Sequence, residues 1–244
     1  KNIWIQDDVR LTRYFKKTNY KTSDYVEFDF QINAVFCDSK NKIWVGFKNT
    51  LKNIPRVTII DPKNQKITPI PLENIVEPVN FFAETKNNTI IRASAKKIIE
   101  YDVAKNKVKK TLSGKNDIRS IFICKDNKIW ACTYSNGFSL FENGVFYKMP
   151  NDTNLFLISA HGIIEDEKGH FWISTNKGLI EVDKKSLLNY HQTKSPVYYQ
   201  HYDTKNGFIT NEFNGGCQPC NSKLSNGYFV FPSLNGLVVF HPEK

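Results

Sequence analysis

Four stretches of twelve residues align without a gap: NAVFCDSKNKIW (33–44), NFFAETKNNTII (80–91), RSIFICKDNKIW (119–130) and HGIIEDEKGHFW (161–172). Each stretch consists of an apolar run, a polar turn and a second apolar run. One turn position holds a residue type that tolerates a left-handed backbone in every copy, namely Asn41, Asn88, Asn127 and Gly169. Each stretch is therefore predicted to form a β-hairpin.

Two further copies flank these four, KNIW at residues 1–4 and NGYFV at residues 226–230. The last residue of each copy serves as an anchor, and the six anchors are Trp4, Trp44, Ile91, Trp130, Trp172 and Val230. Successive anchors are 40, 47, 39, 42 and 58 residues apart. Such periods, with several short strands in each and no helical periodicity, indicate four-stranded propeller blades rather than helical or leucine-rich repeats.

We therefore predict an all-β fold, a β-propeller of about six four-stranded antiparallel blades over residues 1–244. A third strand follows each anchor, as in residues 137–141, 178–183 and 236–240, and a variable fourth strand follows it, as in residues 198–202. The chain begins at a second strand and stops after a third, so both end blades are expected to be incomplete. The four anchor tryptophans are expected to pack between neighbouring sheets, with a sugar-stacking platform as the alternative.

The charged residues indicate which classes of binding partner the chain can have. The net charge is +10, but most of it is lysine in turn-like stretches, and arginine occurs only at positions 10, 13, 56, 92 and 119. Nucleic acid is therefore not a predicted partner, whereas an acidic glycan stays open. No apolar run is long enough to cross a membrane, so a membrane contact would need segments outside these residues.

The five cysteines are too few to build a disulfide-based fold. Cys37, Cys124 and Cys132 are predicted to be small buried apolar residues. Cys217 and Cys220 form a Cys-Gln-Pro-Cys, which is compatible with a local disulfide, a redox pair or half of a zinc site. Because no second such pair supplies further ligands, no metal and no cofactor are predicted.

The segment DEKGHFWISTNKGL (166–179) resembles the blade motif of the two-component regulator propellers. The C-terminal order YDTKNGF (202–208), TNEFN (210–214), NGYF (226–229) and NGLVVFHP (235–242) is similar to the final propeller blade of that family. The chain departs from the family at Cys217 and at Pro219-Cys220, where a small residue is usual.

This resemblance implies the periplasmic sensor part of a membrane-anchored hybrid histidine kinase or related regulator. In such proteins an immunoglobulin-like domain, a membrane helix and a kinase are expected downstream. It further implies detection of an oligosaccharide by paired subunits, hence a homodimer in the parent protein, with no catalysis by this segment. The alternatives are a propeller lyase or hydrolase acting on a glycan or small molecule, and a purely structural or dimerisation propeller.

Five polar residues are candidate ligand contacts: Asn33, Asn80, Arg119, His161 and Asn211. The first four share the first position of the innermost strand and would form a ring at the mouth of the central channel. Their alternative role is to satisfy loop carbonyls or hold channel water. Asn211, with Glu212 and Asn214, matches the family pattern, and side-chain caps of a turn are the alternative there. No catalytic residue is predicted, and His170 is expected to be exposed and without a role.

Overall fold

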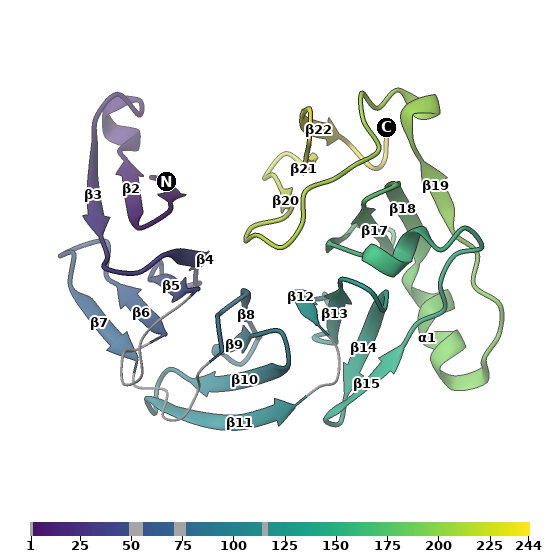
Figure 1. Cartoon of the computed structure of the whole chain (residues 1–244), viewed down its shortest axis with the longest axis horizontal. Helices are drawn as coiled ribbons and strands as arrows, with labels where there is room; N and C mark the ends of the chain where they lie inside the picture. Colours follow the sequence, from purple (N-terminus) through teal and green to yellow (C-terminus); the bar gives the residue numbers. More distant parts are fainter. Residues whose placement is uncertain (1, 49–55, 71–76, 114–116) are drawn as a thin grey trace.

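The computed structural model describes residues 2–48, 56–70, 77–113 and 117–244. Within these ranges, 22 strands form six antiparallel sheets, numbered here in chain order and arranged as blades around a common axis (Figure 1). This confirms the predicted β-propeller. The N-terminal and C-terminal sheets lie on either side of an opening in the ring of ribbons (Figure 1).

The first sheet contains β1 (Ile3–Asp7), β2 (Arg10–Tyr14) and β3 (Ser23–Glu27). The second contains β4 (Ile32–Cys37), β5 (Ile43–Phe47), β6 (Val57–Ile60) and β7 (Ile67–Ile70). The third contains β8 (Phe81–Glu84), β9 (Thr89–Ala93), β10 (Lys97–Asp102) and β11 (Lys107–Ser113).

The fourth sheet contains β12 (Ile118–Ile123), β13 (Ile129–Thr133), β14 (Phe138–Glu142) and β15 (Val145–Lys148). The fifth contains β16 (Gly162–Glu165), β17 (His170–Thr175), β18 (Gly178–Asp183) and β19 (Gln200–Tyr202). The sixth contains β20 (Ser222–Lys223), β21 (Phe229–Ser233) and β22 (Gly236–Phe240). The two end sheets thus have three strands each within the described residues, as expected for incomplete blades.

The repeated hairpins have the predicted turns. Asn41, Asn88, Asn127 and Gly169 adopt positive φ angles of 61°, 56°, 67° and 88°. In the first of these turns, the carboxylate of Asp38 accepts hydrogen bonds from the backbone N–H groups of Lys40 and Lys42 and from Nε1 of Trp44. The turn and the anchor tryptophan are therefore tied together by one buried side chain.

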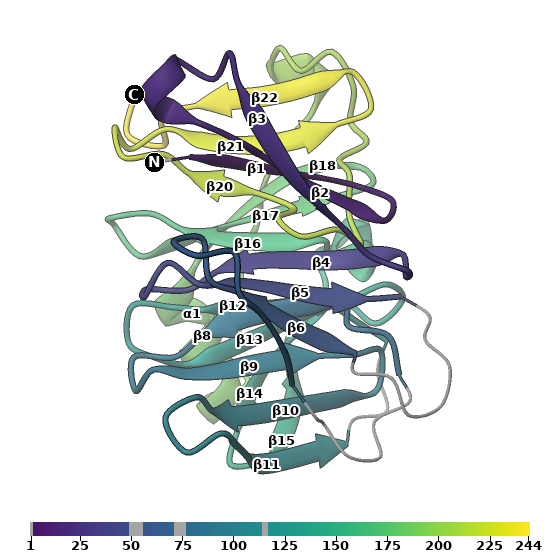
Figure 2. The same cartoon turned by 90° about the vertical axis from the view of Figure 1, so that its left-hand side faces the viewer.

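Three anchor tryptophans are buried and pack against the sheet that follows their own. Trp44 contacts Phe82 of the third sheet, Trp130 contacts Phe171 of the fifth, and Trp172 contacts Phe240 of the sixth, with ring centroids 4.9–6.1 Å apart. A fully buried large aromatic side chain contributes about 3 kcal/mol or more to stability. The inter-sheet contacts at these anchors thus hold successive blades face to face. Figure 2 shows the sheets stacked in this way from the side.

One helix interrupts the repeat. The sequence showed no helical periodicity, so no helix was predicted, but α1 (Lys184–Thr193) lies between β18 and β19. Three 3-10 turns also occur, at η1 (Lys16–Thr18), η2 (Phe156–Ser159) and η3 (Thr204–Asn206). Asp183 caps α1 by accepting hydrogen bonds from the backbone N–H groups of Lys185 and Ser186. Only Leu187 of this helix is buried, so the helix carries almost no apolar periodicity to read.

Two of the three cysteines predicted to be buried are buried. Cys124 and Cys132 lie in the core, whereas the prediction for Cys37 was wrong, because this side chain is exposed beside the first sheet. No helix in the described ranges is long and apolar enough to cross a membrane.

Candidate functional site

The four inner-strand candidates all lie at one end of the innermost strands. Asn33 belongs to β4 and Arg119 to β12, while Asn80 and His161 immediately precede β8 and β16. The inner strands β4, β8 and β12 lie around the centre of the ring (Figure 1). The shared repeat position therefore becomes a shared location in space.

The two asparagines contact the backbone of the next sheet. Nδ2 of Asn33 donates to the carbonyl of Val79 at 2.7 Å, and Nδ2 of Asn80 donates to the carbonyl of Ile118 at 3.0 Å. These bonds link the second sheet to the third and the third to the fourth. Their amide N–H groups are thus used within the fold.

Arg119 and His161 converge on a pocket of about 270 Å³. Its wall also contains Tyr134, Asn176 and the segment 212–216. The fourth and fifth sheets and the C-terminal segment each contribute side chains, so the pocket exists only in the assembled propeller. Its volume is just below the range of about 300–1,000 Å³ that is usual for small-molecule sites.

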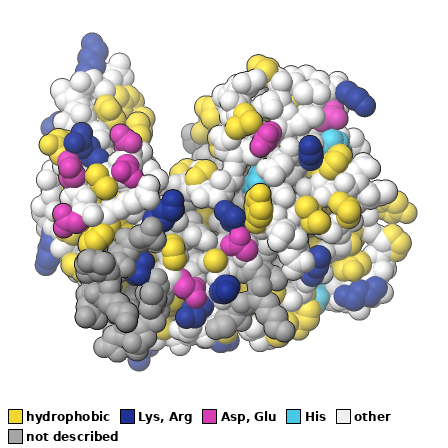
Figure 3. Space-filling model, viewed as in Figure 1, with side chains coloured by type: hydrophobic (Ala, Val, Ile, Leu, Met, Phe, Trp, Pro, Cys, Tyr) yellow, Lys and Arg dark blue, Asp and Glu magenta, His cyan; other side chains and the backbone are white. Residues whose placement is uncertain are grey.

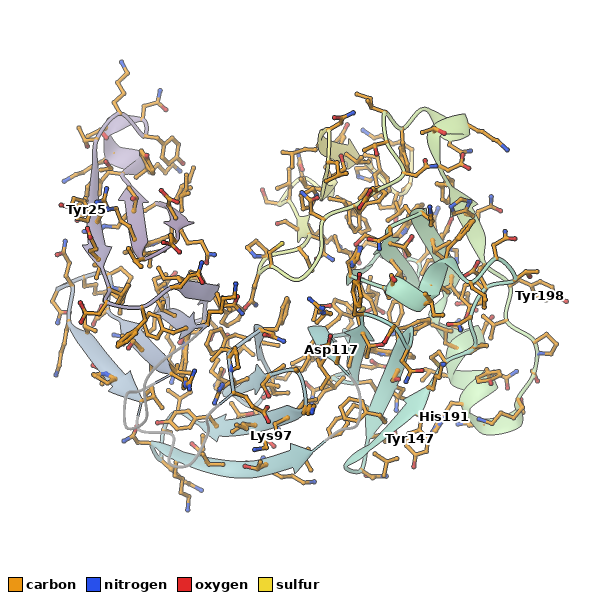
Figure 4. All side chains as sticks on the ribbon, in the orientation of Figure 1. Tyr25, Lys97, Asp117, Tyr147, His191 and Tyr198 are labelled. Carbon is orange, nitrogen blue, oxygen red and sulfur yellow. The ribbon has the colours of Figure 1, made fainter. Side chains whose placement is uncertain are left out.

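Arg119 is partly fixed in place. Its Nη2 lies 3.1 Å from Oδ2 of Asp117, and its guanidinium carbon lies 4.7 Å from the ring centre of Tyr134. Its Nε is buried and makes no hydrogen bond among the described residues. Asp117 is labelled near the centre of the ring in Figure 4. Arg119 thus lines the pocket beside Tyr134, which is 50% exposed.

His161 is a buried, neutral hydrogen-bonding group. Its Nε2 lies 2.7 Å from Oδ1 of Asn176, so Nε2 carries the proton and Nδ1 is an acceptor. Burial lowers the pKa of His161, and the charge of Arg119 lowers it further, against the opposing effects of Asn176 and Glu212. At neutral pH the pocket therefore contains an uncharged imidazole beside a guanidinium.

The C-terminal segment 212–216 forms one wall of the pocket. A Cβ atom on Gly215 would lie 2.2 Å from Nδ1 of His161, and one on Gly216 would lie 3.2 Å from Nη1 of Arg119. Further along, Gln218 makes a pair of hydrogen bonds with the backbone of Phe82 in β8, accepting at 2.8 Å and donating at 2.6 Å. Glycine is needed at position 215 because no side chain fits against the imidazole.

Asn211, the fifth candidate contact, lies outside the pocket. Oδ1 of Asn211 accepts a hydrogen bond from the backbone N–H of Thr204 at 2.7 Å, and Asn211 does not line the pocket. Glu212 and Asn214, which the sequence favoured as turn caps, do line it. Nδ2 of Asn214 also donates to the carbonyl of Ser233 at 3.3 Å.

One cluster has the composition of a metal site. The ligand atoms of Asp166, His170 and Glu181 lie within 4.8 Å of one another. However, Asp166 accepts hydrogen bonds from Nε1 of Trp172 and the backbone N–H of His170, and Glu181 accepts from Tyr202 and contacts Nδ1 of His170 at 2.5 Å. Each of the three side chains thus has a hydrogen-bond partner within the fold. His170 is half-buried and paired, which corrects the expectation of an exposed residue without a role.

Cys217 and Cys220 are free thiols. Sγ of Cys220 is buried and lies 3.6 Å from the carbonyl oxygen of His161, while Cys217 is partly exposed. Burial raises the pKa of both thiols. Their segment serves as part of the channel wall.

Sequence reasoning missed Tyr134, Asn176 and the two glycines of the pocket. Tyr134 follows β13 and Asn176 follows β17, the second strands of their sheets. Both lie beyond the anchor positions at which the aligned twelve-residue stretches end, so the repeat gave no signal for them. The Gly215-Gly216 pair was the available signal, since adjacent glycines mark places where the backbone passes close to another group.

Comparisons with known proteins fit this fold. No family model matches the chain. The chain is 24% identical over 243 residues to Histidine kinase P4 of Formosa agariphila, spanning 98% of this chain and 14% of that protein. It is 19% identical, with a TM-score of 0.73, to the extracellular domain of a hybrid two-component system of B. thetaiotaomicron, covering 99% of this chain and 32% of that one.

Propeller enzymes are similar as well. Virginiamycin B lyase from Staphylococcus aureus matches with a TM-score of 0.69 and 13% identity, covering all of this chain and 81% of the lyase. The chain spans only a small part of the histidine kinase and about a third of the two-component ectodomain. These matches confirm the predicted resemblance: the chain is a β-propeller like those in the extracellular domains of two-component regulators.

Proposed function

We propose that the chain is the extracytoplasmic ligand-sensing domain of a membrane-anchored two-component regulator and that it binds an oligosaccharide. The observation that carries the ligand site is the convergence of Arg119, His161 and Glu212 on one pocket at the mouth of the channel. The similarity to two-component ectodomains supports the sensor role. In the parent protein, two subunits would pair in more than one arrangement. The sugar would bind one arrangement more tightly than the other and so shift the equilibrium toward it.

The chemistry of the pocket favours a sugar that carries an acidic group. A sugar ring needs hydrogen-bond donors and acceptors together with an apolar face to stack on. Asn176, His161 and Glu212 supply the polar groups, and Tyr134 supplies the ring. A uronate or sulfate would pair with Arg119, whose guanidinium geometry matches such groups. Dark blue basic side chains are scattered over the face in Figure 3, so overall charge alone does not define the site.

The test is thermal unfolding with defined neutral and acidic oligosaccharides. A ligand at about a hundred times its Kd stabilises the folded state by about 2.7 kcal/mol, which raises Tm by roughly 5–10 °C. Arg119→Ala and His161→Ala are expected to remove this shift.

Arg10→Ala is the matched control. Arg10 also has a carboxylate partner, Glu27 at 3.0 Å, and a tyrosine ring, Tyr25 at 4.5 Å, but it lies on the first sheet away from the pocket. Tyr25 is labelled there in Figure 4. Retention of the shift in both pocket variants would refute the site. Absence of a shift with every neutral and acidic glycan would refute the oligosaccharide.

A lyase is the second candidate, favoured by the similarity to virginiamycin B lyase. Chromatography of each ligand after prolonged incubation separates the two proposals. A sensor returns the oligosaccharide intact, whereas a lyase yields a cleaved product that His161→Ala no longer forms.

A further inference from the structure

A second pocket, of about 590 Å³, lies at the opposite end of the inner strands from the proposed ligand pocket. It is lined by Glu84, Ile123 and Glu165, the last residues of β8, β12 and β16, and by residues 221–223 at β20. The proposed ligand pocket instead contains residues at the starts of these strands. The volume of the second pocket is within the range usual for small-molecule sites.

The wall of the second pocket is apolar on two neighbouring inner strands. Phe122 and Ile123 of β12 and Ile163 and Ile164 of β16 line it. The two residues of β16 are buried, and the two of β12 are partly buried. Since apolar walls favour the apolar part of an organic molecule, a bare inorganic ion is not the expected occupant.

Three lysines line the mouth of the second pocket, namely Lys86, Lys125 and Lys223. Nζ of Lys86 donates to the carbonyl of Lys125, and Nζ of Lys223 donates to the carboxylate of Glu167. Nζ of Lys125 donates to Glu167 at 2.5 Å and to the carbonyl of Asp166 at 3.1 Å. Because an ammonium has three N–H donors, each lysine keeps at least one that makes no hydrogen bond among the described residues.

The carboxylates of the second pocket are already used as acceptors within the fold. Glu84 accepts from the backbone N–H and the hydroxyl of Ser39, both at 2.7 Å. Glu165 accepts from the backbone N–H of Lys125 at 2.8 Å and from Nζ of Lys184 at 2.5 Å. The mouth therefore has unused donors rather than unused acceptors, which favours an anionic group there.

A buried donor without a partner lies further along the channel. Nδ2 of Asn221 is buried and makes no hydrogen bond among the described residues. A Cβ atom on Gly162 would lie 2.4 Å from this nitrogen, so the amide packs at the start of β16, away from the lysines that follow β8 and β12. A buried donor left unpaired costs free energy, and a ligand oxygen that accepted from it would recover that cost.

We propose that the second pocket binds a small organic anion with an apolar body. Its carboxylate lies at the three lysines, its apolar body lies against Phe122 and Ile163, and an oxygen at its far end accepts from Nδ2 of Asn221. This order follows the pocket itself, with charge at the mouth, apolar walls beside it and one buried donor beyond. The site is separate from the proposed oligosaccharide site and does not rest on it.

The test uses three related compounds and calorimetric titration of the native chain. Para-acetylphenylacetate carries the carboxylate, the ring and the far oxygen, para-isopropylphenylacetate lacks only the far oxygen, and para-acetylphenylacetamide lacks only the charge. The first compound is expected to bind about tenfold more tightly than each of the others. It should also shift the methyl resonances of Ile163 and Ile164.

Two variants assign the ends of the compound to their partners. Asn221→Leu is expected to abolish the preference for acetyl over isopropyl, because the donor is gone. Lys86→Gln should weaken binding of the carboxylate about threefold and leave the amide unchanged. Lys168→Gln is the matched control, since Lys168 is an exposed turn lysine of the next-but-one sheet that does not line the pocket.

The outcomes separate this site from the oligosaccharide site. Absence of binding by all three compounds would overturn the proposal, as would an acetyl preference that persists in Asn221→Leu. Loss of binding in Arg119→Ala together with full binding in Asn221→Leu would also overturn it, because the compound would then occupy the other pocket. Binding that Asn221→Leu and Lys86→Gln weaken, and Arg119→Ala and Lys168→Gln leave unchanged, supports it.

Discussion

Oε2 of Glu165 accepts a hydrogen bond at 2.8 Å from the backbone N–H of Lys125, joining the fifth sheet to the fourth. Glu84 makes the same contact between the third and second sheets, because its carboxylate accepts from the backbone N–H of Ser39 at 2.7 Å. Glu84 and Glu165 occupy one repeat position, and Ser39 and Lys125 occupy another. The repeat therefore encodes an inter-blade clamp as well as a hairpin.

Removing the buried clamp should cost more than removing the exposed one. Glu165 is 5% exposed and also pairs with Nζ of Lys184 at 2.5 Å, so Glu165→Ala leaves the backbone N–H of Lys125 without its acceptor and the ammonium of Lys184 with only Asp126, at 3.7 Å. We expect a loss of about 3 kcal/mol in the free energy of unfolding in urea. Glu84→Ala, at a more exposed contact, should cost about 1 kcal/mol. Equal losses would contradict this ranking.

A carboxylate at the first turn position should stabilise the fourth sheet. Asp38 accepts from Nε1 of Trp44, but the same position holds Cys124 in the fourth sheet, where Nε1 of Trp130 is buried without a hydrogen bond among the described residues. We expect Cys124→Asp to raise the free energy of unfolding by about 1 kcal/mol and Asp38→Ala to lower it by about 2 kcal/mol. The comparison is made by urea titration. A loss with Cys124→Asp would show that burying the new charge outweighs the bond.

Arg92 stands where the other central sheets have an apolar residue, and it is 2% exposed. Burial, together with the charge of Arg56, lowers the pKa of Arg92 to about 10 despite the opposing charge of Glu77. Its Nη2 donates to the carbonyl of Glu77, but Nε and Nη1 have no hydrogen bond in the described ranges. Since a buried charge without full pairing is costly, Arg92→Val should raise the free energy of unfolding by about 1 kcal/mol.

Arg13→Val is the contrasting variant for the same urea experiment. Arg13 is similarly buried, at 7% exposed, but it forms two hydrogen bonds with the carboxylate of Asp24 and one with the carbonyl of Pro62. Its removal takes the charged partner from Asp24, which keeps only the hydrogen bond from Gln65, and should lower the free energy of unfolding by about 3 kcal/mol. If both substitutions destabilised the chain equally, pairing would not be what separates the two arginines.

The lowered pKa of His161 predicts a loss of stability in acid. The unfolded chain binds a proton at this residue near pH 6.5, while the buried imidazole resists protonation. Its contribution to stability is therefore complete above about pH 6.5 and falls as the pH drops toward the lower folded pKa. His161→Gln should flatten the decline of Tm between about pH 7 and pH 5, whereas His241→Gln should not. Parallel declines in all three proteins would exclude His161 as the cause.

Local features of the fold were predictable from the sequence, because each hairpin is specified within twelve residues. The left-handed turn positions, the third strands β18 and β22 and the incomplete end sheets all follow from the repeat. The helix α1 was not predictable, since a single buried residue, Leu187, gives no periodic signal. The prediction for Cys37 was wrong because an apolar strand context does not say which of its side chains face solvent.

The candidate site was only partly predictable. Alignment of the repeats placed Arg119 and His161 at the same end of the inner strands, because residues at the same repeat position occupy the same place in each sheet. It did not reveal that Asn33 and Asn80 contact neighbouring backbone, or that segment 212–216 completes the pocket. These contacts join residues far apart in the chain, and no local pattern encodes them.

The paired hydrogen bonds between Gln218 and the backbone of Phe82 also bear on how the chain folds. They join residues 136 positions apart, so they form after the local hairpins, whose ends meet at a much lower entropic cost. Until Gln218 arrives, the inner edge of β8 is open to pairing with other chains. Docking of the C-terminal segment thus closes this edge, and any delay in docking lengthens the time during which the chain can aggregate there.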